Sequence, residues 1–454
     1  MKLFAILFFK NMDSQCHNII QSSMPNFIFL NRHMRYRKIF LSIGFLLINF
    51  SLSAQDTTQQ IIPGRYNSKE QQQKPYVILI SADGFRPDLA EKYNAVNLLH
   101  LSDNGVQADY MLASFPSLTF PNHYTIVSGL YPAHHGLVDN TFYDPNRKVV
   151  YSMSNKKMVA DSSWYSGTPL WVLSEKQQML SASYFWVATE SAIQGIRPTY
   201  YFIYNEKTEI DSRIQTVKSW LQLPEEKRPH FITFYFPDVD HAEHMYGPDS
   251  KEAADAVHFV DESISKMVAE VNTLNLPVNF VFVSDHGMTK IDTNRVMGLP
   301  LIIDTSKFFV NGEAAVHLYA KEKRFIKPTY EALQKEAKDY DVYLVKKNVP
   351  QRWHYSKKDD RYNRNGDIIL TPHLPAFFTI TSRKNTSIGK HGFDPYIPDM
   401  HATFYAWGPA FKQHFKIGGF ENVNIFPLIA TILGLNYNED DIDGKLKILK
   451  PVLK

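Results

Sequence analysis

Carboxylate and imidazole side chains recur directly after apolar stretches of this sequence. Asp83 and the pair Asp285-His286 each end such a stretch, and Asp240 and His244 follow a third. In an open α/β sheet, ligands bind beyond the carboxyl ends of the strands. Three carboxylates delivered to one edge would repel strongly unless a cation neutralised them. Aspartate combined with imidazole, and no thiolate, suits zinc or another borderline divalent ion.

Each of these motifs also has an ordinary structural explanation when it is taken alone. One aspartate after a strand commonly caps a helix or forms a turn. The pair Asp240-x-x-x-His244 could be two solvated residues on one face of a helix. A further motif, His391-Gly-Phe-Asp394, supplies another imidazole. Taken together, the motifs predict a divalent-metal site.

A candidate nucleophile lies in the segment 115–124. Thr119 comes shortly before Pro121, and proline favours the first turn of a helix. A hydroxyl at a helix start lies in positive potential, and the backbone N–H groups there favour a phosphate. Because a threonine hydroxyl is a weak nucleophile near neutral pH, it needs activation by a metal ion. The alternative is that Thr119 only caps the helix and takes no part in chemistry.

The residues around these motifs predict an alternating architecture of strands and helices. Five predominantly apolar runs have strand length, which suits strands buried on both faces of a parallel sheet. The stretches 212–221 and 252–272 have helical character. This alternation predicts an α/β domain with a largely parallel central sheet flanked by helices. The five runs are Tyr76–Ile80, Phe231–Phe236, Val278–Val283, Ala376–Ile380 and Ala402–Trp407.

Differences in charge and in glutamine content indicate separate segments in the rest of the mature chain. Residues 300–375 are more charged than their surroundings and predict a small inserted subdomain, either a cap over the cleft or a structural insert. The catalytic core would then comprise 75–299 and 376–454. Residues 55–74 are polar and rich in glutamine, which predicts a flexible tether.

The first 54 residues have the features of a leader. A short basic stretch that begins at Met34 precedes an apolar run, which small residues follow up to Ala54. This order is typical of a secretory signal peptide, and the run is shorter than the roughly 20 residues of a membrane span. We therefore expect 34–54 to be a signal peptide and Met34 to be the true start. The mature protein would be exported to the periplasm or the extracellular space without a stable membrane span.

The composition of all 454 residues excludes several classes of protein. The chain has 49 Lys+Arg against 46 Asp+Glu, a formal net charge of +3, so no broad basic field supports nucleic-acid binding. Hydrophobic residues make up 44%, which argues against disorder. The single cysteine, Cys16, rules out an intramolecular disulfide and a cysteine-based metal cluster.

Five motifs occur in an order that identifies a family. They are Ser81–Arg86, Thr119–His123, Asp240–Pro248, Ser284–Met288 and Lys390–Asp394. In this order they resemble the nucleotide pyrophosphatase/phosphodiesterase family, which belongs to the alkaline phosphatase superfamily. The resemblance covers roughly residues 75–435 and implies an alkaline-phosphatase-like core. The cysteine-rich and nuclease-like domains of vertebrate members have no counterpart here, so the chain looks like a secreted bacterial member.

The resemblance implies a site with two zinc ions. One ion would be held next to the nucleophile and the other on the opposite side of the phosphoryl group. The first set of ligands is Asp83, Thr119, Asp285 and His286. The second set is Asp240, His244 and His391. His123 would be structural, and His241 and His401 do not fall on ligand positions.

The resemblance also implies contacts to the substrate. Asn140 matches a side-chain donor to a phosphate oxygen, and Phe120 and Tyr204 would sandwich a nucleobase or another leaving group. The segment 236–238 replaces an acidic pair that is common in animal members, which leaves the fine substrate preference open.

The implied activity is zinc-dependent hydrolysis of phosphodiester or pyrophosphate bonds in nucleotides or related small-molecule diesters. It would release a nucleoside 5'-monophosphate through a covalent phospho-threonine intermediate at Thr119. Residues 115–122 include no basic residue to meet the extra charge of a phosphomonoester, which favours diesters. The alternatives on the same scaffold are a phosphomonoesterase and a choline-headgroup (lysophospholipid or glycerophosphodiester) phosphodiesterase. A catalytically inactive metal-binding module would have no need of the nucleophile.

Overall fold

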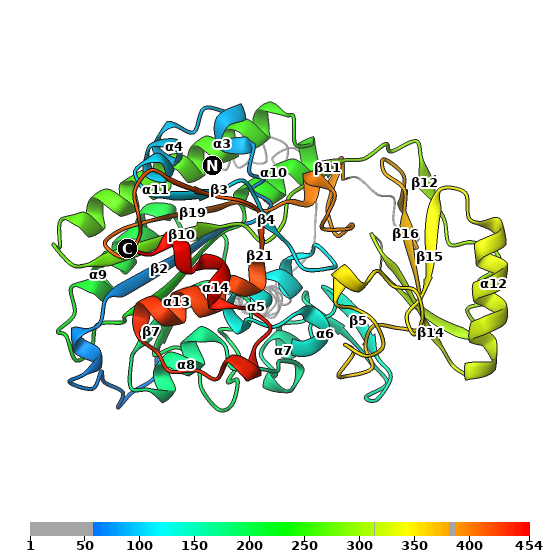
Figure 1. Ribbon diagram of the computed structural model, residues 1–454, viewed down its shortest axis with the longest axis horizontal. Coiled ribbons are helices and arrows are strands. Elements are labelled where there is room, and N and C mark those ends of the chain that lie inside the picture. Colours follow the sequence, from blue (N-terminus) through cyan, green and yellow to red (C-terminus); the bar gives the residue numbers. More distant parts are fainter. Residues whose placement is uncertain (1–57, 313, 381–386) are drawn as a thin grey trace, which may run out of the picture. The chain divides into compact units, whose positions relative to one another are not determined.

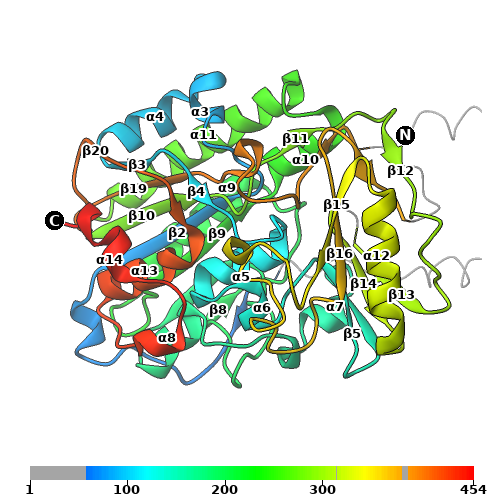
Figure 2. The same cartoon turned by 45° about the vertical axis from the view of Figure 1, so that its right-hand side comes forward.

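Three of the apolar runs form the centre of a nine-stranded sheet in the computed structural model, which describes residues 58–312, 314–380 and 387–454. Strands β9, β2 and β10 lie side by side and parallel at this centre (Figures 1 and 2). Their bounds are Phe231–Phe236, Tyr76–Ala82 and Val278–Val283. Nearly all of their side chains are buried, because helices cover both faces of the sheet. The predicted α/β class and the largely parallel sheet are therefore confirmed.

The remaining strands extend this centre on both sides. The order is β1-β8-β7-β9-β2-β10-β19-β3-β20. The five strands from β8 to β10 are parallel to one another, whereas β19 is antiparallel to β10. The flanking strands are β1 (Gln60–Ile61), β8 (Tyr200–Tyr201), β7 (Ser181–Tyr184), β19 (Phe404–Trp407), β3 (Val106–Ala108) and β20 (Phe415–Ile417).

Helices pack on the two faces of this sheet (Figures 1 and 2). Alternate residues of β2 show the division, because Ile78 belongs to one core cluster and Val77 to the other. One cluster includes residues of α4 (Val96–Asp103), α9 (Ile210–Leu221) and α11 (Lys251–Asn272). The other includes residues of α5 (Thr119–Ser128), α8 (Leu170–Lys176) and α13 (Ile425–Leu433). The helices predicted at 212–221 and 252–272 are α9 and α11.

A second, antiparallel sheet occupies much of the segment 300–375. Its order is β13-β14-β16-β15, and α12 packs against β15 (Figure 1). Apolar residues such as Leu318, Leu333 and Ile368 form a separate core cluster there. The bounds are β13 (Phe308–Asn311), β14 (Val316–Ala320), α12 (Ile326–Glu336), β15 (Tyr340–Leu344) and β16 (Ile368–Pro372).

Two segments have a structure that differs from the one the sequence predicts. The run Ala376–Ile380 was expected in the central sheet, but its two strand residues, β17 (Phe377–Phe378), pair with β12 (Val296–Met297) outside it. Short apolar runs cannot show which sheet they join, because burial alone makes them apolar. In the segment expected to be a tether, β1 pairs with β8 and the Asn67 side chain hydrogen-bonds the backbone of Glu225 and Arg228.

The leader lies outside the described residues. The chain divides between Gln55 and Asp56, and the fold above belongs to the part that ends at Lys454. The expectations for Cys16, for Met34 as the start and for 34–54 as a signal peptide all fall in the part that is not described. Within the described part, none of the helices combines the length and the apolar character that crossing a membrane requires.

Candidate active site

The first predicted ligand set converges on one imidazole nitrogen. The Nε2 atom of His286 lies 2.9 Å from Asp285 Oδ2, 3.4 Å from Asp83 Oδ1 and 3.3 Å from Thr119 Oγ1. Asp83 follows β2, and Asp285 and His286 follow β10, so adjacent parallel strands deliver them to the same edge. Thr119 is the first residue of α5. The three side chains other than Thr119 are almost fully buried.

The second predicted set converges in the same way. Asp240 Oδ1 lies 3.4 Å from His244 Nε2 and 3.6 Å from His391 Nε2, and the two Nε2 atoms are 3.1 Å apart. Asp240 and His244 lie one turn apart on α10 (Asp238–Tyr246), which follows β9. His391 follows β18 (Gly389–Lys390), 147 residues from His244 in sequence. The rings of His391 and His286 stack at 3.7 Å, so the two sets are adjacent.

The side-chain atoms that face each other in these two ligand sets are hydrogen-bond acceptors, which favours a bound cation between them. In each of the three histidines, Nδ1 lies within 2.9 Å of a backbone carbonyl oxygen, which accepts the ring N–H. The carbonyls belong to Gly389 for His244, Gly287 for His286 and Ser117 for His391. In the neutral rings the Nε2 atoms are therefore acceptors, and they face each other and carboxylate oxygens. Acceptors that converge in this way need a cation between them, as in metal sites with oriented histidines.

The carboxylate oxygens support the same conclusion. Asp83 Oδ1, Asp240 Oδ1 and Asp285 Oδ2 are buried and have no hydrogen-bond donor among the described residues. Burial, followed by the charges of Asp285 and Asp240, raises the pKa of Asp83 well above its usual value. A divalent ion would relieve this repulsion without a change of fold. Two combinations, Asp83–Asp285–His286 and Asp240–His286–His391, have ligand atoms close enough to share an ion.

Thr119 lies at the start of a helix, as the sequence predicted. Its helix α5 begins after Leu118, and Pro121 occupies its first turn. The backbone N–H of Phe120 donates to Asn140 Oδ1 at 2.9 Å. Because a backbone N–H can bond only the amide oxygen, this contact fixes the orientation of the Asn140 amide and leaves its NH2 group as a donor. Asn140 is thus held directly beside the candidate nucleophile.

The two aromatic residues predicted to sandwich the leaving group, Phe120 and Tyr204, do not stack on each other in the part of the chain that the structure describes. Phe120 is half-buried and packs against one core cluster. Tyr204 is 38% exposed, and its ring meets Phe185 at 5.1 Å and Tyr235 at 6.1 Å. Burial, followed by the charges of Glu206 and Asp83, raises the pKa of Tyr204 above its usual value. Among the described residues, no stacking contact joins Phe120 directly to Tyr204.

A polar hollow lies beside the segment 206–213. Its volume is about 250 Å³, and it lies between the start of α9, the start of α10 and Phe259 of α11. Asp238, in the segment that departs from the animal pattern, contributes to its wall together with Glu206 and the buried Arg213.

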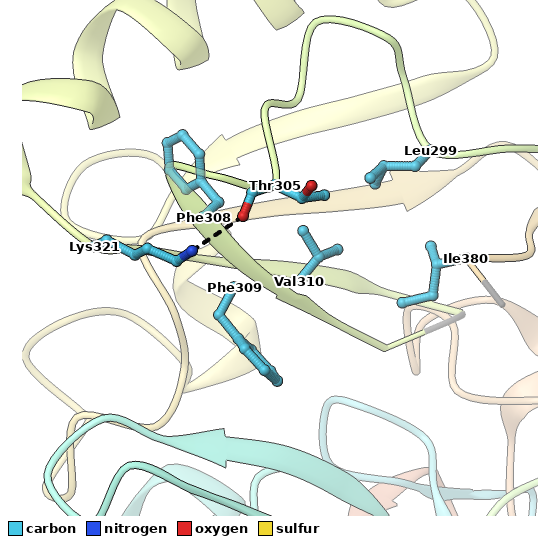
Figure 3. Close-up of a pocket in the computed structure, with 7 residues that line it drawn as sticks. All are labelled: Leu299, Thr305, Phe308, Phe309, Val310, Lys321 and Ile380. Atoms are coloured by element: carbon cyan, nitrogen blue, oxygen red, sulfur yellow. Dashed lines mark hydrogen bonds between the residues drawn. The ribbon is translucent and has the colours of Figure 1, made fainter.

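A second hollow lies in the smaller sheet, away from both ligand sets. It has a volume of about 330 Å³, and Figure 3 shows Lys321 donating a hydrogen bond to the backbone of Thr305 at its wall. None of the predicted site residues lines it. Its lining residues are Leu299, Thr305, Phe308, Phe309, Val310, Lys321 and Ile380.

The sequence missed one side chain that contacts a candidate ligand. The Tyr235 hydroxyl donates to Asp83 Oδ2 at 2.6 Å. Tyr235 is the one partly exposed residue of the apolar run that forms β9, and a polar atom in such a run was the available signal. The histidines predicted to be non-ligands lie elsewhere: His401 stacks on Tyr110 at 4.1 Å, and the exposed His241 is 3.8 Å from Glu206.

The fold and the ligand sets together define the class of this protein. A largely parallel sheet presents buried aspartates, imidazoles and a helix-start hydroxyl at one edge, and this is the alkaline-phosphatase-like arrangement of an α/β protein with a candidate divalent-metal centre. The family model described as type I phosphodiesterase / nucleotide pyrophosphatase matches residues 77–394. The chain belongs to this family.

Relatives at similar levels of identity come from several organisms. The mouse ectonucleotide pyrophosphatase/phosphodiesterase family member 1 is 32% identical over 378 residues, which are 80% of this chain and 41% of the relative. A venom phosphodiesterase of Naja atra is 33% identical over 373 residues, 79% of this chain and 44% of the relative. An uncharacterized pyrophosphatase/phosphodiesterase of Schizosaccharomyces pombe is 32% identical over 399 residues, 83% and 80% of the two chains. The chain therefore spans less than half the length of the first two.

Solved structures show the same fold. Human ectonucleotide pyrophosphatase/phosphodiesterase 5 is 27% identical with a TM-score of 0.77, and the match covers 84% of this chain and all of that one. The murine form, as an inactive threonine-to-alanine variant in complex with AMP, matches at 26% identity with the same TM-score and the same coverage.

Proposed function

We propose that this protein is a zinc-dependent hydrolase of phosphodiester and pyrophosphate bonds in nucleotides or related small diesters. The observation that carries the proposal is the position of Thr119, whose hydroxyl lies 3.3 Å from His286 Nε2 beside the first ligand set. A nucleophile at a helix start next to a cluster of metal-type ligands is suited to phosphoryl transfer. Membership of the family and its named phosphodiesterase relatives support the same activity.

In this proposal two zinc ions would be held, one by Asp83, Thr119, Asp285 and His286, and the other by Asp240, His244 and His391. When bound, such ions act as Lewis acids that stabilise charge on the attacking and leaving oxygens. The imidazole and carboxylate ligands suit zinc, and no thiolate is needed.

The chain's own residues would then perform the transfer. Thr119 Oγ1 forms a bond to phosphorus, the bond to the leaving oxygen breaks, and a phospho-threonine results. Water then cleaves this ester and releases a nucleoside 5'-monophosphate. The Asn140 NH2 group donates to a phosphate oxygen, where a fixed donor contributes most. Phe120 and Tyr204 orient the leaving group by stacking.

The charges near Thr119 favour a diester over a monoester. Arg86, at the end of the motif that contains Asp83, is already engaged. Its guanidinium donates twice to Asp88 at 2.9 Å and once to the carbonyl of Met288 at 2.9 Å. A monoester carries an additional negative charge, and the segment 115–122 around Thr119 contains no Lys or Arg to meet it.

The comparisons add support for a nucleotide substrate and for export. A solved relative binds AMP, and it is inactive when a threonine is replaced by alanine. Other relatives are named as ectoenzymes or as venom enzymes. On this basis we extend the proposal to an exported protein that acts on small molecules. We also propose that 300–375 is an inserted subdomain between core segments 75–299 and 376–454.

A panel of chromogenic substrates tests the class of substrate. We expect hydrolysis of p-nitrophenyl thymidine monophosphate to exceed that of p-nitrophenyl phosphate and p-nitrophenyl phosphorylcholine, and a chelator to abolish it. Preference for p-nitrophenyl phosphate or for p-nitrophenyl phosphorylcholine would instead identify the phosphomonoesterase or the choline-headgroup enzyme. Zinc binding without hydrolysis of any of the three would identify an inactive metal-binding module.

Thr119→Ala tests the nucleophile. We expect turnover of p-nitrophenyl thymidine monophosphate to fall by about 10³-fold or more, because the covalent step is lost. Zinc content, measured by elemental analysis, should stay close to that of the wild type because six side-chain ligands remain. Thr125→Ala removes a hydroxyl from the same helix and should retain activity, since that hydroxyl contacts His135. Wild-type activity in Thr119→Ala would refute the proposed mechanism.

A further inference from the structure

His123 joins the three elements that carry the first ligand set. It lies one helical turn after Thr119 on α5 and is fully buried. Its Nδ1 atom is 3.0 Å from the carbonyl oxygen of Thr119 and 3.3 Å from Asp285 Oδ2. Its Nε2 atom is 2.9 Å from the hydroxyl of Ser81, two residues before Asp83. One ring therefore contacts a residue in or next to each ligand-bearing segment.

The partners of His123 define its hydrogen positions. The carbonyl oxygen of Thr119 can only accept, so Nδ1 carries a hydrogen and donates it to this carbonyl. The same N–H lies 3.3 Å from Asp285 Oδ2, where its positive end interacts with the carboxylate charge. In the neutral ring Nε2 then accepts a hydrogen bond from the Ser81 hydroxyl. The Nδ1–H contact holds the candidate nucleophile's own peptide and a candidate ligand at one fixed separation.

The surroundings keep this ring in place. Trp186 Nε1 donates to the carbonyl of His123 at 3.1 Å, and the Trp186 ring meets the imidazole edge-on at 5.0 Å. The Tyr235 ring packs on it at 5.2 Å, and the Tyr235 hydroxyl bonds Asp83. The other carboxylate oxygen of Asp285 accepts from the backbone N–H of Gly84 at 3.2 Å. Asp285 thus lies between the N–H of Gly84 on one side and the His123 ring on the other.

We propose that His123 is a positioning residue for the metal centre, and that its Nδ1–H sets the orientation of Asp285 relative to Thr119. The inference rests on the proposed function, because His123 would orient a ligand of the zinc ion that the first ligand set is proposed to hold. Residues that orient metal ligands in this way typically change metal affinity or activity by about 10–100-fold when they are removed. A residue that only filled the core would change stability without changing the affinity for zinc.

Two substitutions distinguish the contributions of the two ring nitrogens of His123. In His123→Asn the side-chain NH2 occupies the place of Nδ1, so it can still donate to the carbonyl of Thr119 and present an N–H to Asp285. In His123→Gln the NH2 occupies the place of Nε2, so the contact to Asp285 is lost and the contact to Ser81 is kept. Zinc affinity is measured on the full chain by competition with a chromogenic chelator, together with kcat, KM and the melting temperature.

We expect His123→Gln to bind zinc about 10–100-fold more weakly and to lose kcat with little change in KM. His123→Asn should stay within about threefold of the wild type in zinc affinity, as should Ser81→Ala, which removes only the contact to Nε2. His230→Gln is the matched control, because His230 is fully buried and bonds Pro75 at the opposite, amino end of the strands. It should lower the melting temperature without changing zinc affinity.

Equal zinc affinity in His123→Gln and the wild type would overturn the inference, and so would an equal loss in His123→Asn and His123→Gln. If His123→Gln does not fold, a loss of zinc affinity in both His123→Asn and Ser81→Ala would overturn it. Failure of the proposed function is distinct, because the wild type itself would then bind no zinc, or Thr119→Ala would remain active.

Discussion

At the scale of single residues, the direction of each imidazole is set by a backbone carbonyl rather than by another side chain. His244, His286 and His391 each donate through Nδ1 to such a carbonyl, which leaves Nε2 to face the carboxylates. Because backbone positions are fixed by the sheet and its helices, the donor atoms of the site are oriented before any ion arrives.

Asn140 provides a test of substrate contact at this scale. Asn140→Ala should lower kcat for p-nitrophenyl thymidine monophosphate by about 10²–10³-fold, because it removes one fixed donor to the phosphate. Asn140→Asp keeps an oxygen for the N–H of Phe120 but removes the donor, and it should lose at least as much. Steady-state kinetics measure both, and Asn146→Ala, in an exposed turn, serves as the control. Unchanged kcat in Asn140→Ala would exclude this role.

At the scale of elements, a few contacts connect the segment 356–367 to residues 136–164, which precede the second sheet in the chain. Arg364 donates to Asp144 Oδ2 at 2.9 Å and to the carbonyl of Gly136 at 2.7 Å. Both side chains of this ion pair are 3% exposed. The guanidinium also packs over the ring of Trp164 at 4.9 Å. A buried, fully engaged arginine fixes the position of this segment more firmly than surface pairs do.

Arg364→Met tests this connection. It leaves Asp144 buried with a weaker partner, so the free energy of unfolding should fall by about 3–5 kcal/mol. Urea denaturation measures the change. Lys327→Ala breaks the exposed pair with Glu331 and should change the same quantity by less than about 1 kcal/mol. Adding Asp144→Leu to Arg364→Met should recover part of the loss, and a double variant that is no more stable than Arg364→Met would count against a buried-charge penalty.

At the scale of the whole molecule, histidines buried outside the active site make stability depend on pH. Burial lowers the pKa of His317 to about 4, against an ordinary value of 6.5. Its Nδ1 bonds the carbonyl of Asn365 at 3.1 Å, and its Nε2 has no hydrogen-bond partner among the described residues. The folded state therefore keeps this ring neutral, whereas the unfolded chain binds a proton between pH 4 and pH 6.5.

Because the neutral ring of His317 makes the folded state less stable at low pH, His317→Asn should reduce this pH dependence. Because the unfolded state binds more protons below pH 6.5, the wild type should lose about 1.4 kcal/mol per pH unit from His317 as the pH falls. Asparagine retains a donor for the carbonyl of Asn365 and does not titrate. The loss of unfolding free energy between pH 6.5 and pH 5 should thus be about 2 kcal/mol smaller in the variant. His100→Asn, at an exposed site, should follow the wild type, and equal pH slopes in all three proteins would contradict the assignment.

Much of the fold and of the candidate site followed from local sequence. The runs that form β2, β9 and β10 are apolar because both of their faces are buried, and a carboxylate after such a run must reach the same edge as its neighbours. The motif around Thr119 predicted a helix start because proline suits the first turn. These features depend on nearest neighbours along the chain, so sequence alone could supply them.

Contacts between distant segments needed the tertiary structure. The apolar run Ala376–Ile380 could not show that it pairs outside the central sheet, because apolarity reports burial and not the pairing partner. The convergence of His391 with His244, 147 residues apart, depends on how β18 packs against α10. The role inferred for His123 depends on Ser81 and Asp285 meeting one ring from two different strands. The sequence by itself thus predicted the types of ligand, the candidate nucleophile and the parallel sheet, because these are local properties. Only the tertiary structure decided which side chains share a site and what holds them there, because those distances are set by the packing of segments far apart in the chain.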